Sequence, residues 1–316
     1  MRVVLAGATG TIGRATAAAL AARGHHVIAL VRPGSRPPDA VGETIALAFP
    51  ALPEDVSDVL KNTQLDALVS CLASRTGEPG DAWAIDHHAH LALLSAARAH
   101  GARHFVALSA ICVQEPELAF QRAKLAFEAA LRDAPITHSI VRPTAYFKSL
   151  SGQVARVMAG KPFVVFGDGT LTACKPISDA DLGAYMADCL TDETRWNATL
   201  PIGGPGPVIT PLDQARYLFD ALGKPLALKK VPVALMSAVV GVLSTAGLVS
   251  SRAAAKAELA RIGRFYGTHS MLVLDPVTGQ PSGELTPETG SETLFDYYDR
   301  LLRGEERVDL GEHAVF

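Results

Sequence analysis

Residues 2–13 read RVVLAGATGTIG, and this stretch decides the fold class. Residues 2–6 are a short apolar run rich in β-branched side chains, which predicts a strand. Gly7, Gly10 and Gly13 follow it and lead into a helical pattern. Glycines let backbone N–H groups approach a phosphate without a Cβ in the way, and the start of a helix favours an anion. The order strand, glycine turn, helix therefore predicts a dinucleotide-binding loop, although its spacing is GxxGxxG instead of GxGxxG.

The following residues alternate between apolar runs and helical patterns. Further strands are predicted at 25–32, 44–49, 66–73, 104–110 and 137–144, with helices notably at 81–100 and 115–132. Nearly continuous apolar strands separated by helices are typical of a parallel sheet that is covered on both faces. We therefore expect an α/β, Rossmann-type doubly wound parallel sheet with a smaller, mostly helical C-terminal substrate lobe.

The alternation of predicted strands and helices becomes irregular after about residue 145. A glycine-rich, hairpin-like stretch at 161–178 precedes a helix, and a strand at 198–204 is expected to return to the main sheet. The predicted domains are an NADP-binding domain of residues 1–145 joined by 179–204, and a substrate-binding lobe of residues 146–178 and 205–316.

Composition excludes several classes of protein. Of 316 residues, 48% are hydrophobic and 19% charged, which allows a sizeable core. A net charge of -3 gives no basic surface for nucleic acid. The cysteines are widely spaced, which favours reduced thiols over a disulfide framework, a zinc site or an iron–sulfur site. No targeting leader is recognisable at the N-terminus, so we expect a cytoplasmic protein. The four cysteines are Cys71, Cys112, Cys174 and Cys189.

The segment 231–249 carries no charge over 19 residues. That length is close to the roughly 20 residues that span a bilayer, but its proline, glycines and hydroxyl residues make it a poor spanning helix. We predict a buried helix with one face on an apolar ligand, and a membrane-touching surface is the alternative.

The end of the second predicted strand indicates which dinucleotide binds. An acidic residue at this position would bind the ribose 2′-hydroxyl of NAD, whereas this chain has Arg32 there and Arg36 nearby. Arginine suits a 2′-phosphate, so the sequence favours NADPH. A solvated arginine at a strand end is the alternative interpretation.

The stretch LAFQRAK at 118–124 places Phe120 four residues before Lys124. Together with GATGTIG, Arg32 and Ser109, Lys124 resembles the extended and atypical branch of the short-chain dehydrogenase/reductase superfamily. The resemblance implies that Lys124 holds the nicotinamide ribose hydroxyls and that Ser109 lies near the substrate. The family's usual proton-donating tyrosine would fall on position 120, where this chain has phenylalanine.

Longer stretches of sequence indicate a particular family within this superfamily. They include LSAICVQEPELAFQRAK (108–124), IVRPTAYFKSLSGQV (140–154) and RIGRFYGTHSMLVLDPVTG (261–279). They are similar to the NADPH-dependent divinyl chlorophyllide a 8-vinyl reductases over essentially the whole chain. The resemblance implies an oxidoreductase of (bacterio)chlorophyll biosynthesis that reduces the C8 vinyl group of divinyl chlorophyllide a or divinyl protochlorophyllide a to ethyl. Plant members of this family carry a chloroplast transit peptide, which is not recognisable here. We therefore expect a bacterial enzyme that works in the cytosol beside the photosynthetic membrane, with peripheral membrane contact.

This reaction needs a less demanding acid than carbonyl reduction does, because charge left on the pigment can spread through the macrocycle. Tyr146 is the first choice for the proton donor, and a stacking wall on the pigment is its alternative role.

The predicted catalytic residues are Lys124, Tyr146 and Ser109, and the predicted substrate-binding residues are Tyr146, Phe147 and Lys148, with Lys148 pairing with the propionate carboxylate. The predicted cofactor-binding residues are Gly7, Thr9, Gly10, Thr11, Ile12, Gly13, Arg32, Arg36, Leu72, Ala73, Lys124 and Pro143. The histidines of HHAH (87–90) share no helical face as a set, and we expect no metal site.

Two other functions stay open at this stage. The missing tyrosine would also suit an NADPH-binding regulator or assembly factor of the same fold without catalysis. An atypical reductase acting on another conjugated substrate, such as an isoflavonoid-like compound, is the third hypothesis.

Overall fold

The computed structural model describes residues 1–247 and 250–307. Two compact units divide the chain: unit 1 contains Met1–Pro143 and Asp179–Ile202, and unit 2 contains Thr144–Ser178 and the residues from Gly203 onward. Residues 248–249, which end the predicted apolar segment, and residues 308–316 lie outside the described residues.

Unit 1 is built on a seven-stranded sheet in the order β3-β2-β1-β4-β5-β6-β8. Every neighbouring pair in this sheet is parallel, which confirms the predicted doubly wound sheet. Its strands are β1 (Arg2–Ala6), β2 (His26–Val31), β3 (Glu43–Ala46), β4 (Ala67–Ser70), β5 (His104–Leu108), β6 (Thr137–Pro143) and β8 (Ala198–Ile202).

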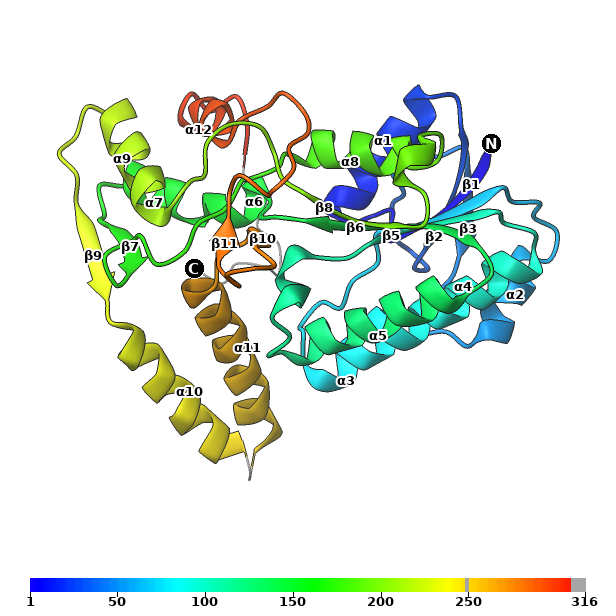
Figure 1. Cartoon of the computed structure of the whole chain (residues 1–316), viewed down its shortest axis with the longest axis horizontal. Coiled ribbons are helices and arrows are strands. Elements are labelled where there is room, and N and C mark those ends of the chain that lie inside the picture. The colour runs from blue at the N-terminus through cyan, green and yellow to red at the C-terminus, as the bar shows by residue number, and fades with distance from the viewer. Residues whose placement is uncertain (248–249, 308–316) are drawn as a thin grey trace. The chain divides into compact units, whose positions relative to one another are not determined.

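Helices cover both faces of this sheet, with α1 and α8 on one face and α2, α4 and α5 on the other (Figure 1). Apolar side chains of β1, β4 and β5 pack against α4 and α5, with Leu68, Leu93, Phe105 and Phe127 in one buried cluster. The helices of unit 1 are α1 (Thr11–Ala22), α2 (Pro53–Leu60), α3 (Pro79–Ala82), the π-helix η1 (Trp83–Ala89), α4 (His90–Ala99), the 3-10 helix η2 (Ile111–Gln114), α5 (Ala119–Asp133), α8 (Asp179–Asp188) and the 3-10 helix η4 (Glu193–Arg195).

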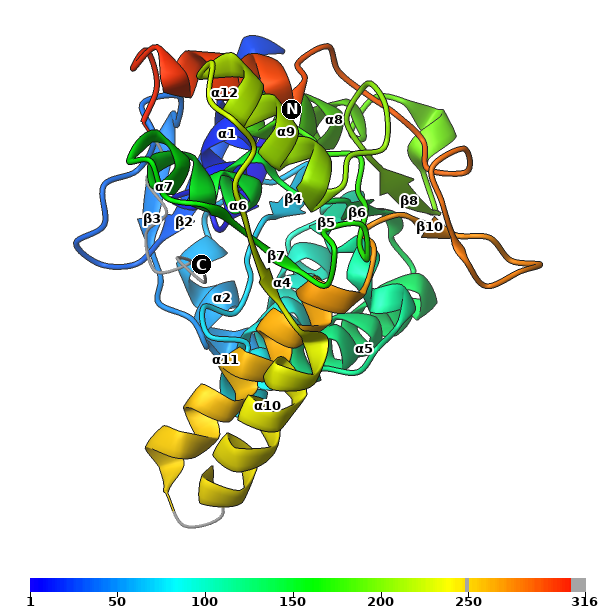
Figure 2. The same cartoon turned by 90° about the vertical axis from the view of Figure 1, so that its left-hand side faces the viewer.

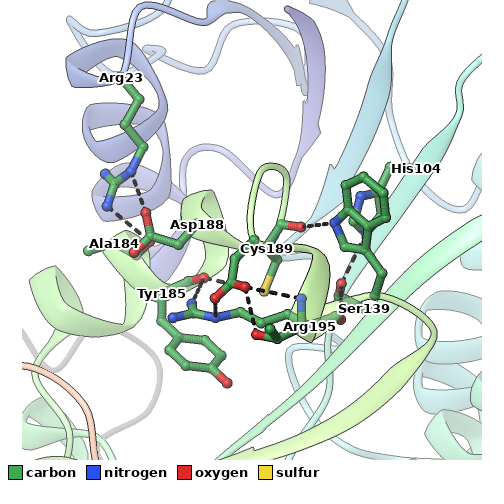
Figure 3. A network of polar contacts seen from close by, with 11 residues as sticks. Arg23, His104, Ser139, Ala184, Tyr185, Asp188, Cys189 and Arg195 are labelled. Atoms are coloured by element: carbon green, nitrogen blue, oxygen red, sulfur yellow. Dashed lines mark hydrogen bonds and ion pairs between the residues drawn. The ribbon is translucent and has the colours of Figure 1, made fainter.

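Residues 179–202 return to unit 1 and are fastened there by polar contacts (Figure 3). The guanidinium of Arg23 on α1 donates to Asp188 on α8 at 2.7 Å. Ser139 on β6 donates to the carbonyl oxygen of Arg195 at 2.7 Å and lies 3.0 Å from Nε2 of His104. Because the Ser139 proton is used on Arg195, this His104 nitrogen is the donor of their shared hydrogen bond. Burial is the main cause that lowers the pKa of His104 to about 4, so this contact keeps a neutral ring.

A Cβ at Gly183 would lie 2.6 Å from the backbone of Ala15, so α8 packs tightly on α1.

The predicted helix at 81–100 is not one regular helix. Residues Trp83–Ala89 form a π-helix between α3 and α4. The side chain of His90 donates from Nδ1 to the carbonyl oxygen of Ile85, five residues earlier, at 2.9 Å. This contact satisfies a carbonyl group within the π-helical segment, and π-helical turns often mark functional sites.

Unit 2 has a core of its own around a two-stranded sheet. The strand β7 (Phe163–Phe166) pairs in parallel with β9 (Leu228–Val231), so the predicted hairpin at 161–178 is wrong: its first strand finds its partner some 60 residues later. Phe147, Phe163, Phe219 and Tyr298 lie in the buried cluster. The remaining elements are α6 (Phe147–Leu150), the 3-10 helix η3 (Ser151–Gln153), α7 (Val154–Met158), α9 (Pro211–Ala221), α10 (Val233–Gly247), α11 (Ser251–Thr268), β10 (Val273–Leu274), β11 (Pro281–Ser282) and α12 (Leu294–Leu302).

The apolar segment that begins at residue 231 forms α10, and the prediction that it is buried is wrong. Val240 is its one buried residue among those described, whereas Leu235, Val239 and Val242 are 55%, 45% and 70% exposed. In residues 1–247 and 250–307, no helix combines the length and the apolar character needed to cross a membrane.

Candidate cofactor and active site

The glycine loop closes by contacts that exclude side chains. Gly7 follows β1 with a φ of +76°, and a Cβ there would lie 2.6 Å from the carbonyl group of Cys71. A Cβ at Gly13 would lie 2.0 Å from the carbonyl oxygen of Gly7. The N–H of Gly10 donates to that same oxygen at 3.1 Å. The loop is therefore a tight turn that brings the start of α1 against the end of β1.

The first turn of α1 offers backbone donors. Thr11 begins the helix and Ile12 is buried beneath it. Gly10 precedes Thr11 in an extended conformation and makes no side-chain cap. The carbonyl oxygen of Thr9 accepts from Arg14 at 3.0 Å, which orders the loop. An uncapped helix start behind a glycine turn suits a pyrophosphate.

The loop lies at the topological switch point of the sheet. β1 pairs with β2 on one side and with β4 on the other, and the strand order reverses there. Ligands of open α/β sheets bind outside the carboxyl ends of strands at such a point. Leu72 and Ala73 follow the carboxyl end of β4, and Pro143 is the last residue of β6, so the predicted cofactor residues of unit 1 share this edge.

Arg32 follows the last residue of β2 and is exposed. The register Ala6↔Leu30 places it at the same sheet edge as Gly7. Its carbonyl oxygen accepts from the N–H of Ser35 at 3.0 Å, which turns the chain away from the strand. Arg36 is more remote from the strand and reaches Asp39 at 3.6 Å in a fully solvated pair. Arg32 is therefore the better placed of the two arginines for a 2′-phosphate.

Lys124 is buried in an ion pair. Its Nζ lies 3.0 Å from Oδ1 of Asp86 on η1, and only 11% of the lysine side chain is exposed. The other oxygen of Asp86 accepts from the hydroxyl of Ser74 at 2.6 Å, and Oδ1 also accepts from the Ser74 N–H at 3.3 Å. These contacts hold Asp86 in one orientation, so the lysine ammonium has a fixed position.

His90 lies beneath the same site as a neutral ring. Because Nδ1 donates to Ile85, Nε2 accepts from the hydroxyl of Ser70 at 3.0 Å. Burial, and secondarily the charge of Lys124, lowers the pKa of His90 to about 4. Ser70 in turn accepts from the N–H of Leu72 at 3.4 Å. His90 thereby supports the loop after β4 without adding a charge.

Ser109 is committed to a second buried carboxylate. Its hydroxyl donates to Glu128 at 2.6 Å, and the Arg142 guanidinium contacts both Glu128 oxygens, at 3.0 and 2.5 Å. Glu128 follows Lys124 by one helical turn, so both point from the same side of α5. Because the Ser109 hydroxyl donates its hydrogen bond to Glu128, Ser109 can accept a hydrogen bond from a ligand but does not supply a proton.

Phe120 lies one turn before Lys124 on α5 and is half-buried. No hydroxyl therefore stands at this turn of the helix. Among the described residues, no group of three or more His, Cys, Asp or Glu side chains could hold a metal ion. None of the four cysteines, all of which lie in the described residues, forms a disulfide bond.

The predicted substrate residues lie in unit 2. Tyr146 precedes α6 and pairs with Ile177 in an isolated β-bridge, and its side chain is half-buried. Phe147 is 3% exposed and packs against Tyr297 at 5.5 Å between ring centroids, in the core. Lys148 is half-buried on α6. Phe147 thus anchors the turn that carries Tyr146 and Lys148 in the core of unit 2.

Sequence reasoning missed three residues of the site: Asp86, His90 and Glu128. Asp86 and His90 stand in the stretch AIDHHAH, which was judged only for metal binding. Glu128 carries a signal that could have been used, since an acid four residues after the lysine on an amphipathic helix shares its face. For Asp86, no spacing in the sequence reveals that a π-helix turns it toward α5.

Comparison with known proteins is consistent with this geometry. Residues 7–193 match the NAD(P)H-binding family. A solved leucoanthocyanidin reductase from Vitis vinifera, in a binary complex with NADPH, shares the fold at a TM-score of 0.69 and 18% identity, covering 96% of this chain and 100% of the other. The fold, the glycine loop and the family match thus define an NAD(P)H-binding α/β protein.

Two relatives show which family of NAD(P)H-binding proteins the chain belongs to. The chain is 48% identical to the chloroplastic divinyl chlorophyllide a 8-vinyl-reductase of Oryza sativa subsp. indica, over 99% of this chain and 82% of the rice protein. It is 46% identical to the Arabidopsis thaliana protein of the same name, over 99% of this chain and 79% of that protein. The chain belongs to the divinyl chlorophyllide a 8-vinyl-reductase family.

Proposed function

We propose that this protein reduces the C8 vinyl group of 3,8-divinyl chlorophyllide a, or of its protochlorophyllide counterpart, to ethyl with NADPH in (bacterio)chlorophyll biosynthesis. The observation that carries the proposal is the identity of 46–48% over 99% of the chain with proteins of that name. The NAD(P)H-binding match over residues 7–193 supports the cofactor class.

The residues of unit 1 fit NADPH. Gly7 and Gly13 close a turn too tight for a Cβ at either position, and the uncapped start of α1 presents N–H donors to the pyrophosphate. Arg32 supplies a positive charge for the 2′-phosphate at the end of β2. The backbone at Leu72 and Ala73, held through Ser70, lines the same edge.

When bound, NADPH supplies the hydride. Lys124 holds the ribose hydroxyls of the nicotinamide half, and Asp86 fixes the direction of its ammonium group. Ser109 accepts a hydrogen bond from the ligand, because its own hydroxyl already donates to Glu128. These roles position the cofactor and the pigment and demand no acid on α5.

The absence of a hydroxyl at Phe120 agrees with this substrate class. Reduction of a carbonyl group develops charge on one oxygen, which needs a nearby acid. Reduction of a vinyl group conjugated to a tetrapyrrole spreads the charge over the macrocycle. Tyr146 is the proposed proton donor or the wall beside the ring, and Lys148 is the proposed partner of the propionate, with Phe147 holding their turn in place.

Peripheral contact with a membrane is also part of the proposal. The pigment is a large, mostly apolar ring, and such molecules collect at membrane surfaces. The exposed apolar side chains of α10 supply a matching surface in unit 2.

Incubation of the purified protein with NADPH and 3,8-divinyl chlorophyllide a tests the reaction. We expect a shift of the Soret band and a product heavier by two hydrogens. Lys124→Met should abolish turnover, while Tyr146→Phe should lower it if Tyr146 donates the proton. NADPH binding without any mass gain would refute the reductase and favour the regulator or assembly-factor function.

The choice of NADPH rests on Arg32 and has its own test. Arg32→Gln should raise KM for NADPH by roughly tenfold or more and leave KM for NADH nearly unchanged, since a charge-assisted contact to the 2′-phosphate is lost. Arg36→Gln is the matched control and should have a smaller effect. Equal use of NADH and NADPH by the unaltered protein would contradict the role of Arg32.

A further inference from the structure

The helices α10 and α11 form a hairpin in unit 2, and both views show them side by side (Figures 1 and 2). The guanidinium of Arg261 on α11 donates to the hydroxyl of Ser244 on α10 at 2.8 Å. A Cβ at Gly247 would lie 3.0 Å from the backbone of Ala254, so the helices approach closely at that end. At the other end, a Cβ at Gly267 would lie 3.5 Å from the side chain of Met236.

The two sides of α10 have different surroundings but the same apolar character. Met236, Val240, Leu243 and Gly247 recur at helical spacing and are buried or half-buried along α11. Leu235, Val239 and Val242 also recur at helical spacing, and these three are 55%, 45% and 70% exposed. A helix that rests against one neighbour normally turns polar side chains outward, so the outer stripe of α10 is an apolar surface without a partner among the described residues.

The charged residues of the chain segment that carries this stripe have one sign, and outside that segment Asp168 lies within electrostatic range of Lys230. Residues 221–257 contain five basic residues and no acidic one, in a chain whose total is 29 Lys and Arg against 32 Asp and Glu. Lys229 and Lys230 stand just before α10, and Arg252 and Lys256 stand in the first turns of α11, and all four are exposed. Glu258, the next acid, is 5% exposed and paired with Arg261 at 2.8 Å.

We propose that the outer stripe of α10, with Lys229, Lys230, Arg252 and Lys256 beside it, docks the protein on the surface of an anionic lipid bilayer. Apolar side chains enter the interface while the lysines and arginine meet the lipid phosphates. The hairpin lies on the membrane and does not cross it, since no helix of residues 1–247 and 250–307 is suited to span a bilayer.

Charge decides between a membrane and other occupants. A second copy of this chain that docked through its own α10 would bring the same basic border against this one, which is repulsive. An uncharged apolar ligand would gain nothing from the five basic residues. An anionic lipid surface uses both the apolar stripe and the basic border.

This inference rests on the membrane contact of the proposed function and specifies its lipid class and its surface. It depends on unit 2 alone and is tested without NADPH or pigment. The full chain is sedimented with vesicles of phosphatidylcholine containing phosphatidylglycerol, and with vesicles of phosphatidylcholine only. We expect binding to the anionic vesicles and its loss at high salt, because the Debye length falls from about 10 Å at 0.1 M to about 3 Å at 1 M. No binding to anionic vesicles at low salt, or equal binding to both kinds, would overturn the proposal.

Variants test the surface itself. Leu235→Ser/Val239→Ser/Val242→Ser should lower vesicle binding at least tenfold, and Lys229→Gln/Lys230→Gln should lower it roughly fivefold per lysine. All five side chains are exposed, so the fold should persist, which circular dichroism checks. Matched controls at exposed sites elsewhere are Leu171→Ser/Val277→Ser and Lys61→Gln/Lys161→Gln, which should bind as the unaltered protein does.

Two results with these variants would count against the bilayer as occupant. One is vesicle binding by the α10 triple variant equal to that of its control. The other is a change of oligomeric state in light scattering with unchanged vesicle binding, which would assign the stripe to a second copy of the chain. Pigment reduction is measured separately, so a failure of membrane docking does not resemble a failure of the enzyme.

Discussion

Among single residues, Lys124 and Asp86 form the pair on which the proposed cofactor clamp depends. Both are nearly excluded from solvent, at 9% and 1% exposure, and Asp86 has further donors in Ser74. A buried ion pair contributes little net stability compared with apolar residues, yet breaking it leaves one charge unpaired in the interior. Substitutions at either residue therefore affect folding as well as cofactor binding.

Asp86→Asn should lower the free energy of unfolding by about 3 kcal/mol, because the Lys124 ammonium stays buried without a counter-charge. The double variant Asp86→Asn/Lys124→Met removes that charge and should recover part of the loss. Urea unfolding of the single and double variants measures both values. If the double variant is less stable than the single one by the full cost of Lys124→Met, the two residues are not coupled.

Gly13 and Gly10 provide a matched pair in the phosphate loop. Gly13→Ala places a Cβ 2.0 Å from the carbonyl oxygen of Gly7, which cannot be relieved without moving the loop, whereas at Gly10 that atom is 3.4 Å away. We expect Gly13→Ala to lower stability by about 2 kcal/mol or more and to abolish NADPH binding. Gly10→Ala should change stability by less than about 1 kcal/mol. Equal stability of the two variants would contradict the geometry of the turn.

At the scale of elements, the strands of the seven-stranded sheet were predictable, whereas the exposure of α10 and the π-helical form of η1 were not. Buried parallel strands give continuous apolar runs, and all six runs predicted before residue 145 and the returning strand at 198–204 correspond to strands of the sheet. The apolar run of α10 carries the same signal as a buried helix, because periodicity reports hydrophobicity and not what covers it. The π-helix η1 has no sequence signature, since it depends on contacts such as His90 with Ile85.

The candidate site was predictable to a similar degree. The glycine loop and Arg32 follow from local spacing, because the strand ends of a parallel sheet share one edge, whereas the role of Lys124 follows from the family resemblance. The partners of Lys124 and Ser109 do not follow from spacing: Asp86 lies 38 residues before Lys124 and is turned toward it by tertiary packing. What Ser109 can do chemically depends on Glu128 and Arg142, which are far from it in the sequence.

The join between η1 and α4 should make folding sensitive to acid. The pKa of His90 is lowered from 6.5 to about 4, mainly by burial. Between these two pH values His90 is protonated in the unfolded chain but stays neutral in the folded one. Stability contributed by neutral His90 is complete above about pH 6.5 and is lost as pH falls toward about 4. At pH 5 the loss should reach about 2 kcal/mol.

Urea unfolding at pH 7 and pH 5 tests this effect in the unaltered protein and in His90→Gln. The variant should be less stable at pH 7 but should lose about 2 kcal/mol less on acidification. His88→Gln, at an exposed position of the same segment, is the control. If His90→Gln and the unaltered protein lose the same stability between the two pH values, another group accounts for the acid sensitivity.

At the scale of the whole molecule, the assignment of NADPH to unit 1 predicts where binding protects the backbone. At 100 times Kd, NADPH should stabilise the fold by about 2.7 kcal/mol. Hydrogen exchange followed by mass spectrometry should slow in residues 7–13, 70–74 and 119–128 and remain unchanged in 233–247. Protection confined to unit 2 would contradict the cofactor site, and Gly13→Ala protein should show no protection anywhere.

The order in which the two units use the chain has a consequence for biosynthesis. β8, the edge strand beside β6, belongs to a segment that follows the first 35 residues of unit 2, Thr144–Ser178. As the polypeptide leaves the ribosome, the outer edge of β6 has no strand partner and the Ser139 hydroxyl lacks its acceptor at Arg195 until residues 179–202 emerge. A nascent chain stalled before that point exposes an open sheet edge to chaperones and proteases. No single peptide cleavage can release either unit as an intact piece.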